Sequence, residues 1–226
     1  MRKFEFLPCI PTRGTFVPAG PDWLHEIKHD GYRLIVQREG GRVRLFTRNG
    51  HDWSDRFPLI VEAALKNKQQ RFVIDGEAVL LGEDGVSDFN GLHSRRHNDR
   101  VKLYAFDILA LNDDDLRSLP LHVRKEKLAR LLAKRPEGIF VSDFEQGEIG
   151  PELFLQACKF GLEGMVSKRR DRPYRAGRSP DWIKVKNRSH PSLDRSRIGG
   201  DTSAKNNLWR DAIVRRARPA RLLFRF

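Results

Sequence analysis

This sequence has few cysteines, no long apolar run and no export signal. Its 226 residues include only two cysteines, Cys9 and Cys158, so neither a disulfide framework nor a thiolate zinc site is indicated. No apolar run approaches the roughly 18 residues that a membrane-spanning helix needs. The N-terminus is basic but has no apolar h-region and no small-residue cleavage site. We therefore expect a cytoplasmic protein without a membrane span.

The glycine-rich loop of P-loop nucleotide-binding proteins is also absent. No Gly-x-x-x-x-Gly-Lys-Ser/Thr pattern occurs, so ATP binding through that architecture is unsupported. Repeats with the periods of solenoids and propellers are missing too. These absences leave one large domain, or two small ones, built around an ordinary hydrophobic core.

Basic residues are abundant, and their distribution divides the chain. Lys and Arg number 43 against 30 Asp and Glu, which gives a net charge of +13. A surplus of that size points to polyanionic partners such as nucleic acid or nucleotides. Residues 188–226 hold 10 of the basic residues and only 3 of the acidic ones. We therefore expect a folded domain at residues 1–187, followed by a basic tail at 188–226 that is flexible or forms a short helix.

Hydrophobic periodicity predicts a mixed fold. Residues 32–38 and 42–47 alternate like strands and are joined through Gly40 and Gly41, which is typical of a hairpin. The segment 8–21 is rich in proline and glycine and is expected to run extended over the surface. The other elements that the patterns indicate are strands at 71–81 (bent, or a pair), 102–111, 164–168 and 182–186, and helices at 59–68, 124–134 and 152–160, the last closed by Gly161. Because strands outnumber helices and many are hairpin-linked, we expect an α+β domain of twisted, largely antiparallel sheets.

Three short acidic and glycine-containing elements are conspicuous. They are Lys28-His29-Asp30-Gly31, Asp75-Gly76-Glu77 and Glu163-Gly164. Each alone is first of all a turn. Their order along the chain, together with the segments 103–107 and 182–186, is more specific than any one of them.

Taken in order, six segments resemble the motifs of the covalent nucleotidyltransferase superfamily, which comprises ATP-dependent DNA ligases, RNA ligases and capping enzymes. The segments are residues 26–33 (EIKHDGYR), 46–50 (FTRNG), 73–77 (VIDGE), 103–107 (LYAFD), 163–168 (EGMVSK) and 182–186 (WIKVK). The resemblance covers about residues 5–187. Residues 92–96 and 174–179 look most like the ligase domain of bacterial ligase D, which is used in end joining. The resemblance implies the covalent-nucleotidyltransferase fold, with helices flanking the sheets.

The resemblance implies that Lys28 is the nucleophile. Its amine would attack the α-phosphate of ATP, which requires a neutral lysine and therefore a lowered pKa. Lys184 and Lys186 alternate with Val185 on a predicted strand, so both side chains face the same side. The resemblance assigns these two lysines to the neutralisation of phosphate oxygens in the transition state.

The resemblance also implies residues that bind the nucleotide and a metal. Glu26 resembles the residue that reads the exocyclic amine of adenine, and Phe106 the ring that stacks on the base, although the core is an equally good place for this phenylalanine. Glu77 would serve the ribose or a metal and Glu163 a metal, Mg²⁺ or Mn²⁺, which prefers hard oxygen ligands. Basic residues implied at the ribose, the phosphates or the DNA end are Arg33, Arg48, Lys168 and Arg178.

The function that this resemblance implies is that of an ATP-dependent DNA ligase in DNA repair and recombination. Lys28 would take AMP and release pyrophosphate, AMP would pass to the 5′-phosphate of a nick, and the 3′-hydroxyl would displace it. We expect a monomer in the bacterial cytoplasm, associated with the nucleoid, acting on nicked or broken double-stranded DNA. An RNA ligase or capping-type enzyme would use the same Lys28, and a catalytically weak DNA-binding protein that needs a partner would keep only the basic loops.

The sequence departs from the family after residue 187. Ligases of this family carry a following OB-fold, whereas residues 188–226 are too few for a five-stranded barrel. We therefore expect no complete OB-fold in this chain. Either the first step is slow, or a separate OB-fold or end-joining partner protein supplies the missing part.

Overall fold

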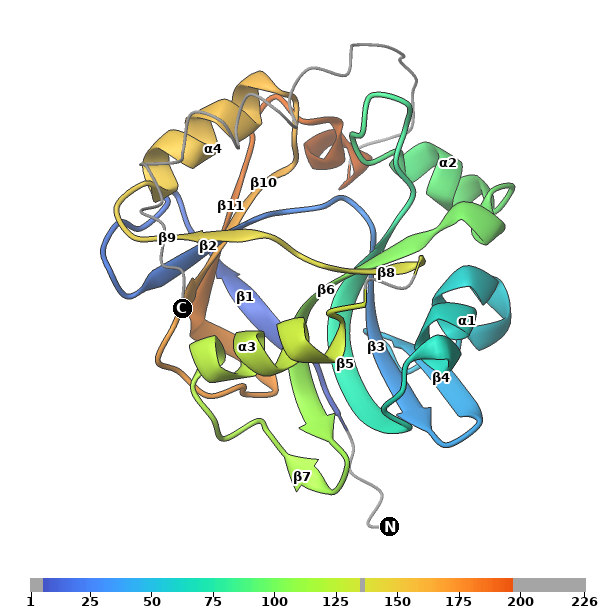
Figure 1. Cartoon of the computed structure of the whole chain (residues 1–226). Coiled ribbons are helices and arrows are strands. Elements are labelled where there is room, and N and C mark those ends of the chain that lie inside the picture. The colour runs from blue at the N-terminus through green and yellow to red at the C-terminus, as the bar shows by residue number, and fades with distance from the viewer. Residues whose placement is uncertain (1–5, 135–136, 197–226) are drawn as a thin grey trace, which may run out of the picture.

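Two β-sheets face each other in the computed structural model, which describes residues 6–134 and 137–196 (Figure 1). The larger sheet has six strands in the order β4-β3-β5-β6-β7, and β8 pairs with β6. All its pairs are antiparallel except β6 with β8. Its strands are β3 (Tyr32–Glu39), β4 (Arg42–Thr47), β5 (Arg71–Val79), β6 (Lys102–Leu111), β7 (Asp114–Asp115) and β8 (Ile139–Val141).

The smaller sheet has five strands in the order β1-β11-β10-β2-β9. β2 lies between β9 and β10 and is antiparallel to both, whereas β1 runs parallel to β11. Its strands are β1 (Cys9–Arg13), β2 (Trp23–Ile27), β9 (Phe144–Gln146), β10 (Gly164–Arg169) and β11 (Gly177–Lys186).

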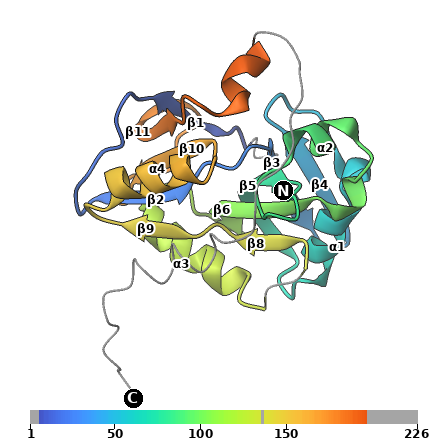
Figure 2. The same cartoon turned by 90° about the horizontal axis from the view of Figure 1, so that it is seen from above.

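The described part of the chain has four α-helices, which pack against the sheets, and Figure 2 shows α4 and α1 on different sides of the domain. They are α1 (Pro58–Lys66), α2 (Phe89–Ser94), α3 (Leu121–Leu131) and α4 (Gly150–Lys159), and short 3₁₀ turns occur at Ser54–Arg56, Asn98–Arg100 and Pro191–Ser196. Pro58 opens α1, where a missing backbone N–H costs nothing. Gly161 follows α4 with φ 70°, which confirms it as the residue that ends this helix.

The alternation of side chains on β3 explains how the sheets and helices share the core. Leu34 and Val36 point to one face and pack in the largest apolar cluster with α1 and α3. Ile35 points to the opposite face and packs with residues of both sheets, among them Phe106 and Trp182. A third cluster joins α4 to β10 and β11. The apolar cluster between the two sheets is therefore smaller than the cluster under α1 and α3.

One buried ion pair fastens α3 to the larger sheet. Arg124 of α3 donates from Nε and Nη2 to the two carboxylate oxygens of Asp107 in β6, at 2.8 and 2.9 Å, and neither side chain is exposed. Arg124 also donates to the carbonyls of Leu119 and Arg172. A single guanidinium thus holds a helix, a strand and the connection between β10 and β11.

The structure confirms the α+β class and the β3–β4 hairpin, and it corrects several expectations. The proline-rich segment was expected to cross the surface, but it contains β1, and Cys9 is buried. Pro11 fits there because β1 is an edge strand with a free side. Residues 71–79 form one strand rather than a pair, and the register of β5 on β6 shifts on either side of Ile74 and Asp75.

The helix predicted at 124–134 begins and ends earlier, at 121 and 131, because Pro120 precedes its first turn. The patterns missed β2, α2 and the short strands β7, β8 and β9. The greater part of the expected basic tail, residues 197–226, lies outside the described residues. In the part of the chain that the structure describes, no helix has the length and apolarity to cross a bilayer.

We predict that Arg124→Leu lowers the free energy of unfolding by about 3 to 5 kcal/mol, because it leaves the carboxylate of Asp107 buried without its cation. Urea denaturation of the full chain measures this. Replacing both partners, Arg124→Leu with Asp107→Leu, is expected to recover part of the loss, since no buried charge is then left uncompensated. A single variant within about 1 kcal/mol of the parent would contradict this role.

Candidate active site

The end of β2 places Lys28 at the opening between the two sheets. Glu26 and Lys28 lie two residues apart, on the same side of an extended segment, as the spacing predicts. The chain then turns at Gly31, where a Cβ would collide with the carbonyl oxygen of Ala78 in β5. Glycine is therefore required at the turn that carries the chain from the smaller sheet to the larger one.

Lys28, Glu163 and Lys186 form an ion-paired cluster. The Nζ of Lys28 lies 2.5 Å from Oε2 of Glu163, and the Nζ of Lys186 lies 2.8 Å from Oε1 of the same carboxylate. Burial alone would raise the pKa of Glu163, but the two ammonium groups outweigh it and hold that pKa below its usual range. Glu163 is thus an ionised carboxylate with a cation on each oxygen.

The glycine after Glu163 explains how this cluster is assembled. Gly164 has φ 142°, and a Cβ there would collide with the carbonyl oxygen of Val185 in β11. The start of β10 can therefore lie directly against β11, the strand that carries Lys184 and Lys186.

A cavity of about 170 Å³ adjoins this cluster and gathers eight of the eleven residues that the motifs indicated. His29, Ser142, Val166 and Trp182 line it as well. Glu163, Lys186 and Arg178 are not among its lining residues. The predicted residues that line the cavity are Glu26, Lys28, Arg33, Arg48, Glu77, Phe106, Lys168 and Lys184.

Arg33 is held by a network that the motifs did not indicate in full. Its Nε and Nη2 each lie 2.6 Å from a carboxylate oxygen of Asp75, which is fully buried. Tyr174 donates its hydroxyl to Asp75 at 2.6 Å and accepts the backbone N–H of Cys9 at 2.8 Å. Burial opposes the charge of Arg33, but the carboxylate of Asp75 outweighs it and raises the pKa of the guanidinium. Arg33 is therefore a fixed, permanent cation at the cavity wall.

Phe106 lines the cavity, yet cations contact its ring in this structure. The guanidinium of Arg33 lies 4.6 Å from the ring centroid, and the Nζ of Lys168 lies 4.1 Å from it. The same Nζ is 4.2 Å from the ring of Trp182. These cation–π contacts account for part of the stabilisation of two buried charges. The stacking of Phe106 on a base stays a prediction.

Glu26 is the second carboxylate with a lysine on each oxygen. Its partners are Lys168, at 2.7 Å from Oε2, and Lys125 of α3, at 2.6 Å from Oε1. Burial lowers the pKa of Lys168 to about 8, although Glu26 opposes this shift. Lys125 was not indicated by any motif.

Glu77 differs from the other acidic residues of the site. It lies opposite Arg33 in the pairing of β3 with β5 and lines the cavity. Burial raises the pKa of Glu77 to about 7, against the cations Lys28 and Arg33. Within residues 6–134 and 137–196, its carboxylate forms no ion pair that would offset this cost. Among the described residues, no group of three or more His, Cys, Asp or Glu side chains could hold a metal ion.

Lys184 and Arg178 lie on β11 at different depths. Lys184 lines the cavity, and its pKa is lowered by burial and by the nearby ammonium groups of Lys28 and Lys186. Arg178 is exposed at the outer end of the strand. The strand thus presents Lys184 and Lys186 toward the cluster of Lys28 and Glu163, as the alternation predicts. Arg178 lies outside this cluster.

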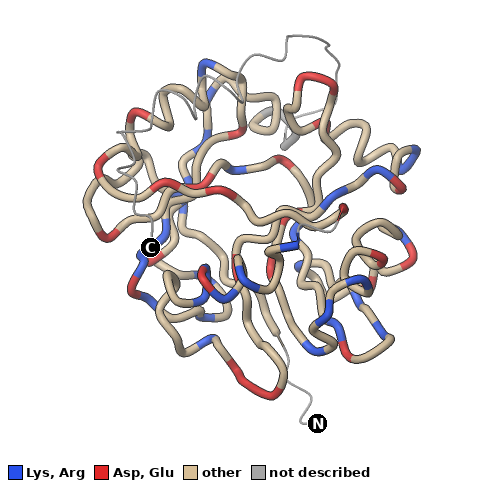
Figure 3. The backbone as a smooth tube through the Cα atoms, in the orientation of Figure 1, with Lys and Arg blue, Asp and Glu red and all other residues tan. Residues whose placement is uncertain are grey.

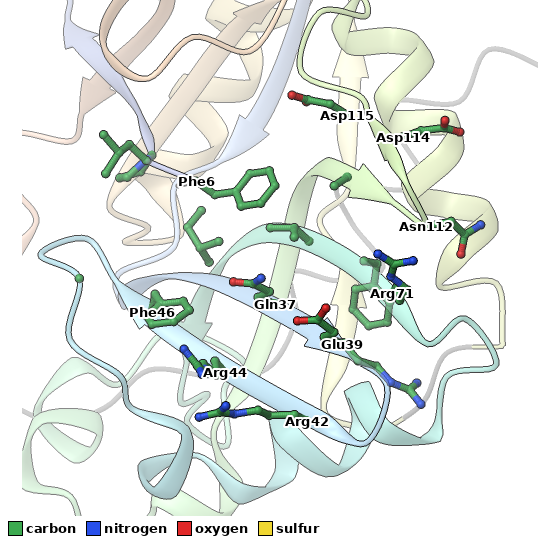
Figure 4. A pocket seen from close by; sticks show the side chains of 18 of the residues that line it. Phe6, Gln37, Glu39, Arg42, Arg44, Phe46, Arg71, Asn112, Asp114 and Asp115 are labelled. Atoms are coloured by element: carbon green, nitrogen blue, oxygen red, sulfur yellow. The ribbon is translucent and has the colours of Figure 1, made fainter. Parts of the chain in front are cut away.

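A larger hollow, of about 670 Å³, lies on the open face of the larger sheet (Figure 4). Its floor is apolar, with Phe6 and Phe46, while Arg42 and Arg44 of β4 flank one side. The acidic residues Asp113, Asp114 and Asp115, at and beside β7, flank the other side, and Figure 3 shows this acidic segment in red. Of the predicted residues only Arg48 lines it, so its size does not make it the reactive centre.

A family model described as the ATP-dependent DNA ligase domain matches residues 14–186. The chain belongs to the ATP-dependent DNA ligase domain family. This ligase domain is 41% identical, over 172 residues, to the multifunctional non-homologous end joining protein LigD of Pseudomonas aeruginosa. The aligned region covers 75% of this chain and 20% of that protein. It is 36% identical over 175 residues to a probable DNA ligase of Streptomyces coelicolor, covering 71% of this chain and 34% of that one.

Solved structures agree with the fold of this ligase domain. It matches a mycobacterial DNA ligase D complexed with ATP and MES with a TM-score of 0.70 and 34% identity, over 81% of this chain and 62% of that one. The structure of Chlorella virus DNA ligase-adenylate shares the fold, with a TM-score of 0.56 and 18% identity. The match covers 80% of this chain and 68% of that one. The ligase domain spans a fifth to a third of the length of the curated relatives named above.

We predict that the imidazole of His29 stays neutral at pH 6. The ring lies beside that of Tyr104, with centroids 4.5 Å apart, and burial together with the charge of Lys28 lowers the pKa of His29 to about 4. In the unfolded chain a histidine gains its proton near pH 6.5. The contribution of His29 to stability is therefore complete above about pH 6.5 and is lost as the pH falls through about 4. Imidazole NMR resonances assigned with His29→Gln measure this, and a midpoint above pH 6 would refute it.

Proposed function

We propose that this ligase domain is the adenylation part of an ATP-dependent DNA ligase that acts in bacterial end joining. The observation that carries the proposal is the clustering of Lys28 with Glu163 and Lys186 beside a cavity rich in cations. A triphosphate needs cations at its oxygens, and a covalent transfer needs a nucleophile at the mouth of the same cavity. The identity to LigD supports the end-joining role.

In the first step, the amine of Lys28 attacks the α-phosphate of ATP, a phosphorus–nitrogen bond forms, and pyrophosphate leaves. The amine of Lys28 is engaged by the carboxylate of Glu163, so this ion pair has to open and the amine has to give up its proton before attack. Lys184 and Lys186 then stand on the same strand to neutralise the phosphate oxygens. AMP passes from Lys28 to a DNA 5′-phosphate, and a 3′-hydroxyl displaces it.

A divalent metal, Mg²⁺ or Mn²⁺, fits part of the site. Glu77 offers a half-buried carboxylate that lines the cavity, and a hard cation prefers such an oxygen ligand. Glu163 has both oxygens engaged by lysines and would have to release one of them. When bound, the metal would supply charge neutralisation at the phosphates. Arg33, Arg48 and Lys168 would hold the ribose and phosphates, while Glu26 and Phe106 would contact the base.

The connection between β10 and β11 is the surface that we assign to the DNA backbone. It is held to the rest of the domain at three points. His122 forms a hydrogen bond with the backbone carbonyl of Arg170, and Arg124 donates to the backbone carbonyl of Arg172. Tyr174, within the connection, donates its hydroxyl to the carboxylate of Asp75. Arg175 of this connection and Arg178 at the start of β11 are exposed, and neither forms an ion pair with another described residue. A rigid support for exposed guanidinium groups suits phosphate binding.

We further propose that the domain works as a monomer in the cytoplasm, on nicked or broken double-stranded DNA. Residues 188–226 add basic charge behind the domain at 1–187. An OB-fold or an end-joining partner protein takes part in the reaction.

We predict that the full chain, incubated with Mg²⁺ and α-labelled ATP, takes up a label that survives denaturation, because the phosphoramidate is covalent. Lys28→Ala abolishes the label, and the matched control Lys68→Ala, at an exposed lysine remote from the cavity, keeps it. Nicked DNA added afterwards removes the label from the protein. An unlabelled protein that still binds nicked DNA would contradict the proposed adenylation.

We also predict that Arg175→Ala with Arg178→Ala weakens binding to nicked duplex and reduces the slope of log K against log salt by about two, one for each lost phosphate contact. Fluorescence anisotropy at several salt concentrations measures the slope. Arg130→Ala, on the exposed side of α3, serves as the control and leaves the slope unchanged. Equal slopes for the double variant and the parent would exclude this surface from DNA binding.

A further inference from the structure

Three buried charged side chains meet behind the nucleotide cavity. Lys125, Glu26 and Lys168 have side chains that are only 2 to 3% exposed, and the two lysines lie 2.6 and 2.7 Å from different oxygens of the carboxylate. Two positive charges and one negative charge thus share a space without water. Such an arrangement costs desolvation energy, which only close and complementary contacts offset.

The members of this triad differ in their access to the cavity. Glu26 and Lys168 line it, whereas Lys125 is not among the lining residues and reaches Glu26 from α3, on the far side. The Nζ of Lys125 also lies 4.8 Å from the ring centroid of Phe144 in β9, which helps to hold it in place. Any influence of Lys125 on a bound nucleotide therefore acts through Glu26.

A carboxylate that is clamped on both oxygens cannot rotate freely about its last bond. An ionised carboxylate only accepts hydrogen bonds, so it attracts an amino group and repels a carbonyl oxygen. Burial would otherwise favour the protonated acid, which donates a hydrogen bond instead. The two lysines outweigh burial and keep the pKa of Glu26 below its usual range, with the larger of their two contributions from Lys125.

We propose that Lys125 is a positioning residue for base selection, holding the carboxylate of Glu26 toward the cavity as a fixed acceptor. The site then favours a purine with an amino group at position 6 over one with a carbonyl group there. This inference rests on the proposed nucleotide site, and it adds a residue of α3 that does not touch the nucleotide.

The charge count makes Lys125 open to substitution. Lys125→Met removes one of two cations and leaves Glu26 and Lys168 as a neutral pair, so no buried charge is stranded. Methionine also keeps much of the length and apolar contact of the lysine stem. Glu26→Gln, in contrast, leaves two buried cations facing each other without their anion. We therefore expect the lysine variant to fold and the glutamine variant to lose stability.

The test measures equilibrium binding of ATP and GTP to the full chain by displacement of a fluorescent ATP analogue, without requiring turnover. We expect the parent to prefer ATP, and Lys125→Met to reduce the ratio of the two dissociation constants about tenfold, the worth of one hydrogen bond to a charged group. Lys125→Arg, which keeps the cation, recovers part of the ratio. The control Lys127→Met, on the same helix but outside the triad, leaves it unchanged.

A purine riboside triphosphate, which lacks the amino group, separates selection from general damage to the site. It binds the parent less tightly than ATP does, and in Lys125→Met this difference shrinks. A folded Lys125→Met that discriminates as the parent does, or a parent without preference, would overturn the proposal. Labelling of Lys28 by α-labelled ATP reports separately on the proposed function, so a chain that selects ATP but takes no label would refute adenylation alone.

Discussion

Charge compensation in a space without water is the constraint on which the site depends. Four carboxylates between or beside the sheets are buried, and a cation from another part of the chain contacts each of them, which offsets the cost of burial. The pairs join strands and helices that are otherwise connected only by long stretches of chain. They are Glu163 with Lys28 and Lys186, Glu26 with Lys125 and Lys168, Asp75 with Arg33, and Asp107 with Arg124. The carboxylate of Glu77 is half-buried and has no ion pair among the described residues, and its pKa is raised to about 7.

Local chemistry explains what could be predicted from the sequence. Period-two alternation located β3 and β4, an apolar run located β6, and Gly161 marked the end of α4. The motifs indicated Lys28 and Glu163, which are 135 residues apart and yet form one ion pair. Their likeness to a family, rather than any rule of spacing, brought these residues together. The roles given to Arg178 and Phe106 stay predictions, because no observation on the described residues tests them.

Partners that act from the far side of a strand could not be predicted. Lys125 looks like any lysine of an amphipathic helix, and only the packing of α3 on β6 turns it toward Glu26. Tyr174 stands in a loop full of arginines, where an aromatic ring suggests nucleic-acid contact, but its hydroxyl is used inside the protein. The strand β1 was not predicted because prolines obscure its alternation, and because it is formed by pairing with the distant strand β11.

That pairing has a consequence for how the domain is made. β1 joins β11 across a separation of 168 residues at its first pair, Cys9 with Gly177, and β2 lies beside β10 with a similar separation. Closing such long loops is slow, and local contacts cannot substitute for it. During synthesis the larger sheet has all its strands once residue 141 has emerged, while the smaller sheet waits for β10 and β11. Lys28 therefore meets Glu163 and Lys186 only in the last stage of folding, so a truncated or unfinished chain carries the proposed nucleophile without the ion pairs that surround it.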